Sequence, residues 1–202
     1  MEKEYVLSLA RARRSVRKYS GEPVDLEDVL YALEAASQAP SGSNRQPWRF
    51  MIVTDPEVKG SIREASESGE REFYARVSGE WGRWLSGKGL SWRKPFLEEA
   101  PVLVLILSEM GAPYHRESVW LATGYVLLAL QERGLETLTY TPSDAKRVAE
   151  SVGAPAGFSL EVVLPIGLSL DGGTKETRRK VGEMTFHNRW WERTGVEVST
   201  GP

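Results

Sequence analysis

Hydrophobic residues recur every three or four positions along several stretches of the chain, a spacing that predicts amphipathic helices. The clearest stretch follows Asp25, a residue that caps helix N-termini well, and it predicts a helix ending near Gln38. Further helices are predicted over residues 2–14, 56–66, 116–133 and 143–153, the last begun by Ser143 as N-cap. Gly134 follows the long helix in a position that commonly ends one.

Other stretches are apolar without that helical spacing, and they predict β-strands. Residues 102–107 include no polar side chain, which is typical of a strand covered on both faces. Three more strands are predicted over residues 49–54, 137–140 and 160–168. Because helices and strands do not alternate as regular βαβ units, the pattern favours an α+β fold. A chain of 202 residues has the length of one domain, so residues 1–202 are predicted to form a single domain.

Three segments depart from this simple pattern. Residues 68–98 interleave glycines with large aromatic side chains, which favours a lid over an active site. Residues 170–202 are polar and arginine-rich but carry Trp190 and Trp191, so we expect an arm that lies across a partner subunit; the alternative is a tail folded back on its own chain. The helix over 116–133 is apolar nearly all round, so it is expected to be buried centrally or in a dimer interface.

Composition disfavours several classes of function. The chain has no cysteine and only two histidines, His115 and His187, so disulfides, thiolate nucleophiles and a metal site are not expected. A net charge of −2 provides no positive field for a polyanion, so nucleic acid is not an expected partner. The longest apolar run is far shorter than the ~18 residues of a membrane span, and no secretory segment is seen. We therefore expect a cytoplasmic protein without a membrane partner.

Two arginine clusters could bind an anion. The turn Arg13-Arg14-Ser15-x-Arg17 combines guanidinium groups with a hydroxyl, which suits a phosphate. Such a turn is otherwise a solvated charged face, and this alternative stays open. A second cluster, Arg178-Arg179, lies in the tail.

A loop from Pro40 to Trp48 is the third candidate. Gly42 would let the backbone approach a ligand closely, and the amides of Asn44 and Gln46 suit the edge of a heterocycle. The loop could equally be a plain connection. No glycine-rich dinucleotide or P-loop motif occurs, so a nicotinamide, if used, would dock transiently.

Taken in order, these motifs resemble the FMN-dependent nitroreductase superfamily over nearly the whole chain. The resemblance is carried by Arg13-Arg14-Ser15-Val16-Arg17-Lys18-Tyr19, by Ala39-Pro40-Ser41-x-x-Asn44-x-Gln46-Pro47-Trp48, and by Ala100-Pro101 before an apolar strand. It implies a mixed or antiparallel central sheet flanked by helices. It also implies a domain-swapped homodimer with two FMN sites at its interface and C-terminal arms exchanged between the subunits.

The resemblance assigns roles to individual residues. The FMN phosphate would be held by the arginine turn together with a tail arginine, for which Arg179 is the first candidate. Ser41 and Gly42 would lie against the isoalloxazine ring. The cofactor-binding set implied in this way is Arg13, Arg14, Ser15, Arg17, Pro40, Ser41, Gly42, Asn44, Thr139, Tyr140, Thr141, Arg178 and Arg179.

The predicted lid narrows the resemblance to the iodotyrosine deiodinase branch. The residues concerned are Glu70-Arg71-Glu72-Phe73-Tyr74, Trp81, Trp92-x-Lys94 and Leu138-Thr139-Tyr140-Thr141-Pro142. The resemblance implies that Glu70, Tyr74 and Lys94 grip the zwitterion of a halotyrosine, whose phenol oxygen meets the backbone near Ser43. A carboxylate suits the ammonium, and a lysine with a phenol suits the carboxylate.

Two alternatives to this lid assignment remain open. Glu70 and Tyr74 could be mere neighbours on a helix surface, with Lys94 solvated. The interval from Tyr74 to Trp81 is one residue shorter than is usual in the family, so Phe73 could face the ligand in place of Tyr74.

The family places a hydroxyl at the position of Thr141 against flavin N5, and this makes Thr141 the catalytic candidate. A hydroxyl can donate a hydrogen bond to an unprotonated ring nitrogen and accept one from a protonated nitrogen, whereas a backbone amide can only donate. The alternative is that Thr141 merely precedes Pro142 in a turn.

Three functions remain in view. The first is an FMN-dependent oxidoreductase that reductively dehalogenates halogenated tyrosine. The second is a broad nitroreductase or quinone reductase that takes electrons from NAD(P)H. The third is a flavin-binding dimer without catalytic activity. The sequence names neither the physiological substrate nor the electron donor.

Overall fold

An antiparallel sheet of four strands organises the chain, and the computed structural model describes residues 4–170 and 172–190 around it. The strands are β1 (Trp48–Val53), β2 (Val102–Glu109), β3 (Glu136–Thr137) and β4 (Phe158–Gly167). Their order in the sheet is β1-β2-β4-β3, and each neighbouring pair runs antiparallel. The α+β fold with an antiparallel sheet flanked by helices is therefore confirmed.

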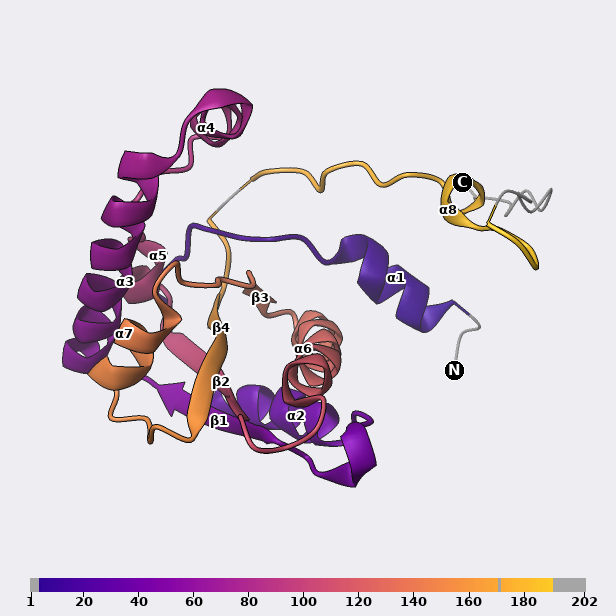
Figure 1. Ribbon diagram of the computed structural model, residues 1–202, viewed down its shortest axis with the longest axis horizontal. Helices are drawn as coiled ribbons and strands as arrows, with labels where there is room; N and C mark the ends of the chain where they lie inside the picture. The colour runs from indigo at the N-terminus through magenta and orange to yellow at the C-terminus, as the bar shows by residue number, and fades with distance from the viewer. Residues whose placement is uncertain (1–3, 171, 191–202) are drawn as a thin grey trace.

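The helices cover the sheet and extend beyond it (Figure 1). They are α1 (Tyr5–Ala12), α2 (Leu26–Ser37), α3 (Pro56–Arg76), α4 (Gly79–Gly87), α5 (Phe96–Glu99), α6 (His115–Glu132), α7 (Ala145–Ser151) and α8 (Val181–Met184), with a short 3-10 turn at Gly42–Asn44. As predicted, Asp25 caps α2, since its side chain accepts a hydrogen bond from the backbone N–H of Glu27.

The two central strands are apolar on both faces because helices pack against both. Alternate residues of β2, such as Val104 and Ile106, belong to a core shared with α2 and α6. The residues between them, such as Leu103 and Leu105, belong to a second core shared with α3, α5 and α7. The continuous hydrophobic run of residues 102–107 thus reflects a strand buried on both sides.

The end of α3 and the cap of α7 differ from the prediction. Helix α3 continues to Arg76 instead of ending at residue 66, so the first residues of the predicted lid, 68–76, are helical. In this part of α3, Glu67 and Glu70 are buried, whereas Glu72 is exposed. Helix α7 is capped by Asp144 and not by Ser143, because the Asp144 carboxylate accepts the backbone N–H of Arg147. The Ser143 side chain bonds to Glu70 instead.

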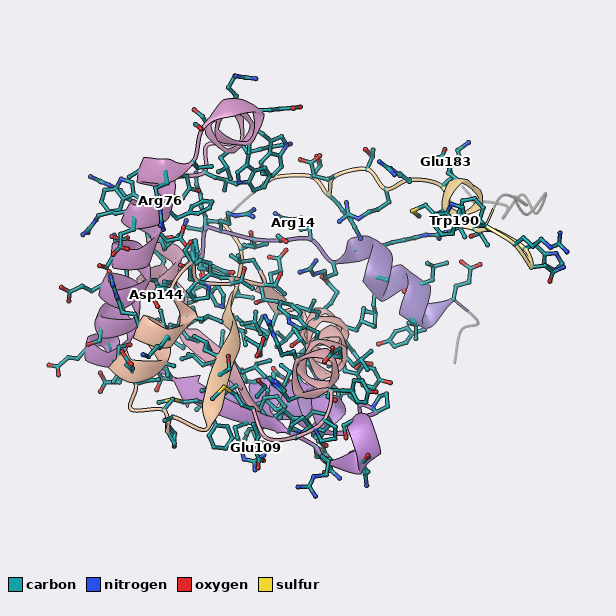
Figure 2. All side chains as sticks on the ribbon, viewed as in Figure 1. Arg14, Arg76, Glu109, Asp144, Glu183 and Trp190 are labelled. Atoms are coloured by element: carbon teal, nitrogen blue, oxygen red, sulfur yellow. The ribbon has the colours of Figure 1, made fainter. Side chains whose placement is uncertain are left out.

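The C-terminal arm runs alongside α1 and away from the sheet (Figure 1). The Lys175 ammonium donates hydrogen bonds to the carbonyls of Ala10 and Arg11 at the end of α1. At the far end, Trp190 stacks on Phe186 and is 78% exposed (Figure 2). Residues 172–190 of the arm therefore do not fold back on the core, while Trp191 and the rest of the arm lie outside the described residues.

Helices α1 and α6, which pack against each other, and the arm all expose apolar side chains. Helix α6 buries one face, including Val119 and Val126, but leaves its other face exposed. The large exposed apolar side chains of α1, α6 and the described part of the arm are Tyr5, Val6, Leu7, Trp120, Leu121, Tyr125, Leu170, Val181, Met184 and Trp190. In the described part of the chain, no helix has the length and apolarity needed to cross a membrane.

Candidate functional site

A cavity of about 1200 Å³ lies between the arginine turn, the end of α3, helix α4 and the start of the arm. It also takes in residues 88–96 and 138–143. Of the predicted site residues, those that line it are Arg14, Ser15, Arg17, Glu70, Tyr74, Lys94, Thr139, Tyr140, Thr141 and Arg178. Segments far apart in the sequence thus form one cavity.

The arginine turn is held against the end of the sheet by backbone bonds. The N–H of Val16 donates to the Thr137 carbonyl, and Leu170 donates to Lys18 where the arm begins. These bonds explain how two arginine clusters separated by most of the chain meet at one wall. Figure 2 shows Arg14 on the segment between α1 and the sheet.

Positive charge gathers at this wall: Arg14, Arg17, Lys175 and Arg178 line the cavity, and Arg13, which is not among the lining residues, lies close to Lys175 and Arg178. Arg14 pairs with Glu136 at 3.5 Å and its guanidinium bonds to Ser169. The Nε of Arg13 is buried and has no hydrogen-bond partner among the described residues. Burial and the neighbouring Arg178 lower the pKa of Arg13, which marks a site that favours an added anion.

Lys175 is a wall residue that the sequence reasoning missed. Burial, Arg178 and Arg13 lower the pKa of its ammonium, so it belongs to the same cationic cluster. It lines the cavity together with Arg178, whereas Arg179 does not. The structure therefore favours Arg178 over Arg179 as the tail arginine of the site. The only signal in the sequence was a lysine just after Gly172-Gly173, three residues before the arginine pair.

Three of the predicted substrate-binding residues, Glu70, Tyr74 and Lys94, lie together across the cavity. Glu70 and Lys94 are 4% and 8% exposed, and their charged groups pair at 3.2 Å between Oε2 and Nζ. The Lys94 ammonium also lies 5.1 Å from the centre of the Tyr74 ring. Burial lowers the pKa of Lys94, opposed by Glu70, and raises the pKa of Tyr74. Glu70 and Lys94 are thus not solvated side chains of a helix surface.

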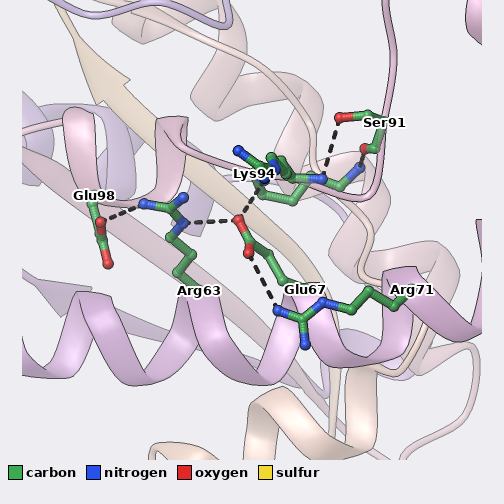
Figure 3. A network of polar contacts seen from close by, with 7 residues as sticks. Arg63, Glu67, Arg71, Ser91, Lys94 and Glu98 are labelled. Carbon is green, nitrogen blue, oxygen red and sulfur yellow. Dashed lines mark hydrogen bonds and ion pairs between the residues drawn. The ribbon is translucent and has the colours of Figure 1, made fainter.

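A second glutamate, Glu67, fixes the backbone at Lys94 (Figure 3). Its Oε1 accepts the Lys94 N–H at 2.8 Å and the Nε of Arg63 at 2.8 Å, and Arg71 lies on its other oxygen at 3.9 Å. Although burial acts to raise the pKa of Glu67, these hydrogen bonds and charges lower it overall. The sequence shows the Arg63-Glu67-Arg71 spacing along α3. It does not show that Glu67 also binds the backbone N–H of Lys94.

The outer wall of the cavity is aromatic. Trp81 and Trp84 of α4 stack with ring centres 5.0 Å apart and planes 6° from parallel, and both are about half exposed. Phe73 and Tyr74 both line the cavity and pack edge to face. Since the lysine ammonium lies over the Tyr74 ring, the structure favours Tyr74 over Phe73 as the polar partner of Lys94.

The segment from Thr139 to Ser143 closes the cavity floor. Tyr140 is buried, its ring packs edge to face on Phe96, and its hydroxyl donates to Glu70 at 3.0 Å. Burial and the Glu70 charge raise the pKa of Tyr140, so the phenol stays protonated. Thr141 is exposed at the cavity.

The loop from Pro40 to Asn44 does not line the cavity. It packs at the start of α6, where a Cβ on Gly42 would lie 2.7 Å from the Pro113 carbonyl and 2.9 Å from the Tyr114 ring. Within a single chain the glycine permits this internal contact, and its role beside a ligand stays a prediction. Ser43 and Asn44 have φ of 52° and 53°, an uncommon backbone for such residues. A single chain therefore brings none of Pro40, Ser41, Gly42, Ser43 and Asn44 to the cavity.

Comparison with known proteins reveals extensive similarity. The model of the family described as "Nitroreductase family" matches residues 10–168. The iodotyrosine deiodinase of Thermotoga neapolitana is 50% identical over 173 residues, covering 86% of this chain and 93% of that protein. The iodotyrosine deiodinase of Haliscomenobacter hydrossis is 36% identical, covering 79% and 77%.

Solved structures agree in fold. A crystal structure of oxidised iodotyrosine deiodinase bound to FMN and 3-iodo-L-tyrosine matches with a TM-score of 0.84 and 49% identity, covering 86% of this chain and 95% of that one. A nitroreductase with bound FMN from Bacteroides fragilis matches with a TM-score of 0.71 at 23% identity, covering 90% and 98%, which shows the fold alone.

We expect Glu67→Gln to lower the stability of the protein at pH 7 by about 1–3 kcal/mol, since it removes a buried charge that accepts charged hydrogen bonds. Folding lowers the Glu67 pKa, so its contribution is complete above the ordinary glutamate pKa of about 4.3 and is lost as the pH falls through the folded value. Urea unfolding at several pH values should show the gap from wild type narrowing in acid. Glu64→Gln, on the exposed face of α3, is the matched control. A gap that stays constant down to pH 3 contradicts the assignment.

Proposed function

The chain belongs to the nitroreductase family, and from this premise we propose that it is an FMN-dependent oxidoreductase that removes halogen from halogenated tyrosines. The observation that carries the proposal is the buried Glu70–Lys94 pair, which faces the same cavity as a cationic cluster that the described residues compensate only in part. The 50% identity to a deiodinase and the similarity to a deiodinase structure bound to FMN and 3-iodo-L-tyrosine support the same function.

The cationic cluster fits the phosphate of FMN. A dianionic phosphate would satisfy the Arg13 Nε and relieve the repulsion among Arg13, Lys175 and Arg178. Arg14, Ser15 and Arg17 line the same wall and would add donors. When bound, FMN supplies the electrons for replacing the aryl halogen by hydrogen, and the protein supplies binding and orientation.

The Glu70 and Lys94 side chains fit the zwitterion of an amino acid. The ammonium of the substrate would bind the Glu70 carboxylate, and its carboxylate would bind Lys94 and the Tyr74 hydroxyl. Residues 68–98 then act as the lid: α4 brings Trp81 and Trp84 over the aromatic ring and excludes water from it.

Thr141 is the residue that we place against the flavin ring. It is exposed at the cavity and follows Tyr140, which is itself held on β4 through backbone bonds with Val163. Its hydroxyl can rotate, so it can donate to an unprotonated ring nitrogen and accept from a protonated one. This suits a cofactor whose protonation changes with its redox state.

The complete site requires a second copy of the chain. The loop from Pro40 to Asn44 lies outside the cavity of its own chain, while an apolar surface on α1, α6 and the arm is exposed. We place this surface in a homodimer interface, with arms 170–202 exchanged and the loop of each subunit, including Ser43, at the flavin of its partner. A reductant such as NAD(P)H would dock transiently.

The aromatic outer wall keeps a second function in view. The stacked Trp81 and Trp84 and the large cavity could admit flat nitroaromatics or quinones that carry no zwitterion. Comparing turnover of 3-iodo-L-tyrosine with that of 2-iodophenol separates the two, because only the first substrate engages Glu70 and Lys94.

Arg13→Gln should weaken binding of FMN by about 10- to 100-fold, the effect of one or two charged hydrogen bonds. Binding of riboflavin, which lacks the phosphate, should change much less. Fluorescence titration of the apoprotein with both ligands measures this, and Lys146→Gln on the exposed side of α7 serves as control. Equal losses for FMN and riboflavin would place the phosphate elsewhere.

Lys94→Gln should raise KM for 3-iodo-L-tyrosine by about 10-fold or more, because it removes the charge that pairs with the substrate carboxylate. FMN should stay bound, and KM for 2-iodophenol should be nearly unchanged. Steady-state assays on both substrates test the assignment, and an unchanged KM for iodotyrosine refutes it.

Sedimentation equilibrium should give twice the chain mass of 22.6 kDa for the FMN-loaded protein. Leu121→Glu places a charge on the exposed apolar face of α6 and should produce a folded monomer that has lost FMN binding. A wild-type monomer that carries one FMN per chain would rule out the shared site.

A further inference from the structure

One oxygen of Glu70 is occupied by donors from a single short segment. Its Oε1 accepts the Tyr140 hydroxyl at 3.0 Å, the Ser143 hydroxyl at 2.9 Å and the Ser143 backbone N–H at 3.2 Å. Its Oε2 pairs with Lys94 at 3.2 Å. The two oxygens thus face different parts of the site: Oε1 the segment 140–143, and Oε2 the lysine of the zwitterion pocket.

The close approach of α3 to this segment is built into the fold. A Cβ on Gly69 would lie 2.7 Å from the Asp144 side chain and 3.1 Å from its backbone nitrogen, so only glycine fits beside residues 143–144. Arg147 bonds to Ser68 and to Glu72 at 3.3 Å, one on each side of this contact along α3. The helix therefore holds the end of the 140–143 segment at several points.

Thr141 lies between the two residues that Glu70 holds. The backbone of Tyr140 is paired with Val163 of β4 in both directions, at 3.0 Å and 2.8 Å, which anchors the segment on one side. On the other side Ser143 is bound to Glu70 through both its N–H and its hydroxyl. Pro142, between them, fixes its own φ and donates no backbone bond.

We propose that Glu70 is also a positioning residue, whose Oε1 holds the 140–143 segment and thereby sets the direction of the Thr141 hydroxyl toward the cofactor. This rests on the proposed function, which supplies the flavin that Thr141 faces and the ammonium that Oε2 receives. One carboxylate then joins the substrate pocket to the flavin contact. An interaction that changes Glu70 on one side changes the other side as well.

Ser143→Ala tests the clamp without altering Lys94 or the charge of Glu70. In the apoprotein, hydrogen exchange of the Tyr140 and Ser143 amides, which bond to Val163 and Glu70, should quicken by about 10-fold, because a hydrogen bond to a charged acceptor is lost. Ser151→Ala is the matched control: the Ser151 hydroxyl bonds to the Val148 carbonyl within α7, and its loss should leave this exchange unchanged.

The loaded protein tests the link to Thr141. The ratio of Kd values for oxidised and reduced FMN should change by about fivefold in Ser143→Ala, the effect of one misdirected hydrogen bond. Tyr140→Phe, which keeps the ring contact with Phe96, should change the ratio in the same direction. The Ser151→Ala control should match wild type in both measurements.

Each outcome decides a part of the proposal. Unchanged exchange in both Ser143→Ala and Tyr140→Phe overturns the clamp, and faster exchange with an unchanged affinity ratio overturns its action through Thr141. A chain that binds no FMN overturns the proposed function, and with it the flavin contact, while exchange in the apoprotein still tests the clamp.

Discussion

The central strands β2 and β4 must be covered on both faces, and this requirement determines how the helices are arranged around the sheet. Their side chains are nearly all buried, so apolar helices are needed on each side of the sheet. Helices α2 and α6 supply one layer, and α3, α5 and α7 supply the other. The second layer brings the acidic face of α3 against the segment that follows β3, where the cavity lies.

Electrostatics divides that cavity into two parts. The wall built from the arginine turn and the arm holds like charges that are only partly compensated within the described chain, a costly arrangement unless an anion is bound. On the wall built from α3 and residues 91–94, Glu70 and Lys94 place one negative and one positive group side by side. The first part suits a phosphate and the second a zwitterion, in agreement with an FMN enzyme acting on an amino acid.

Two buried glutamates of α3, Glu67 and Glu70, together fix the position of Lys94. Glu67 binds the Lys94 backbone (Figure 3). Glu70 binds the Lys94 ammonium, so both the position of the loop and the direction of the side chain are set. Such double support limits the rotamer freedom of a long side chain before ligand arrives, and thereby reduces the entropy lost on binding.

Local patterns determined much of this protein by themselves. Periodicity placed α2, α6 and β2 within one or two residues, because each buries a regular stripe or face, and the ordered motifs indicated the family and FMN. Only the tertiary structure decided that α3 continues through residues 68–76, that Lys175 joins Arg13 and Arg178, and that the loop at Gly42 lies away from its own chain's cavity. These facts depend on contacts between residues far apart in the chain. The spacing of hydrophobic residues along the sequence reveals the period of a helix or a strand. It does not reveal which distant residues come into contact.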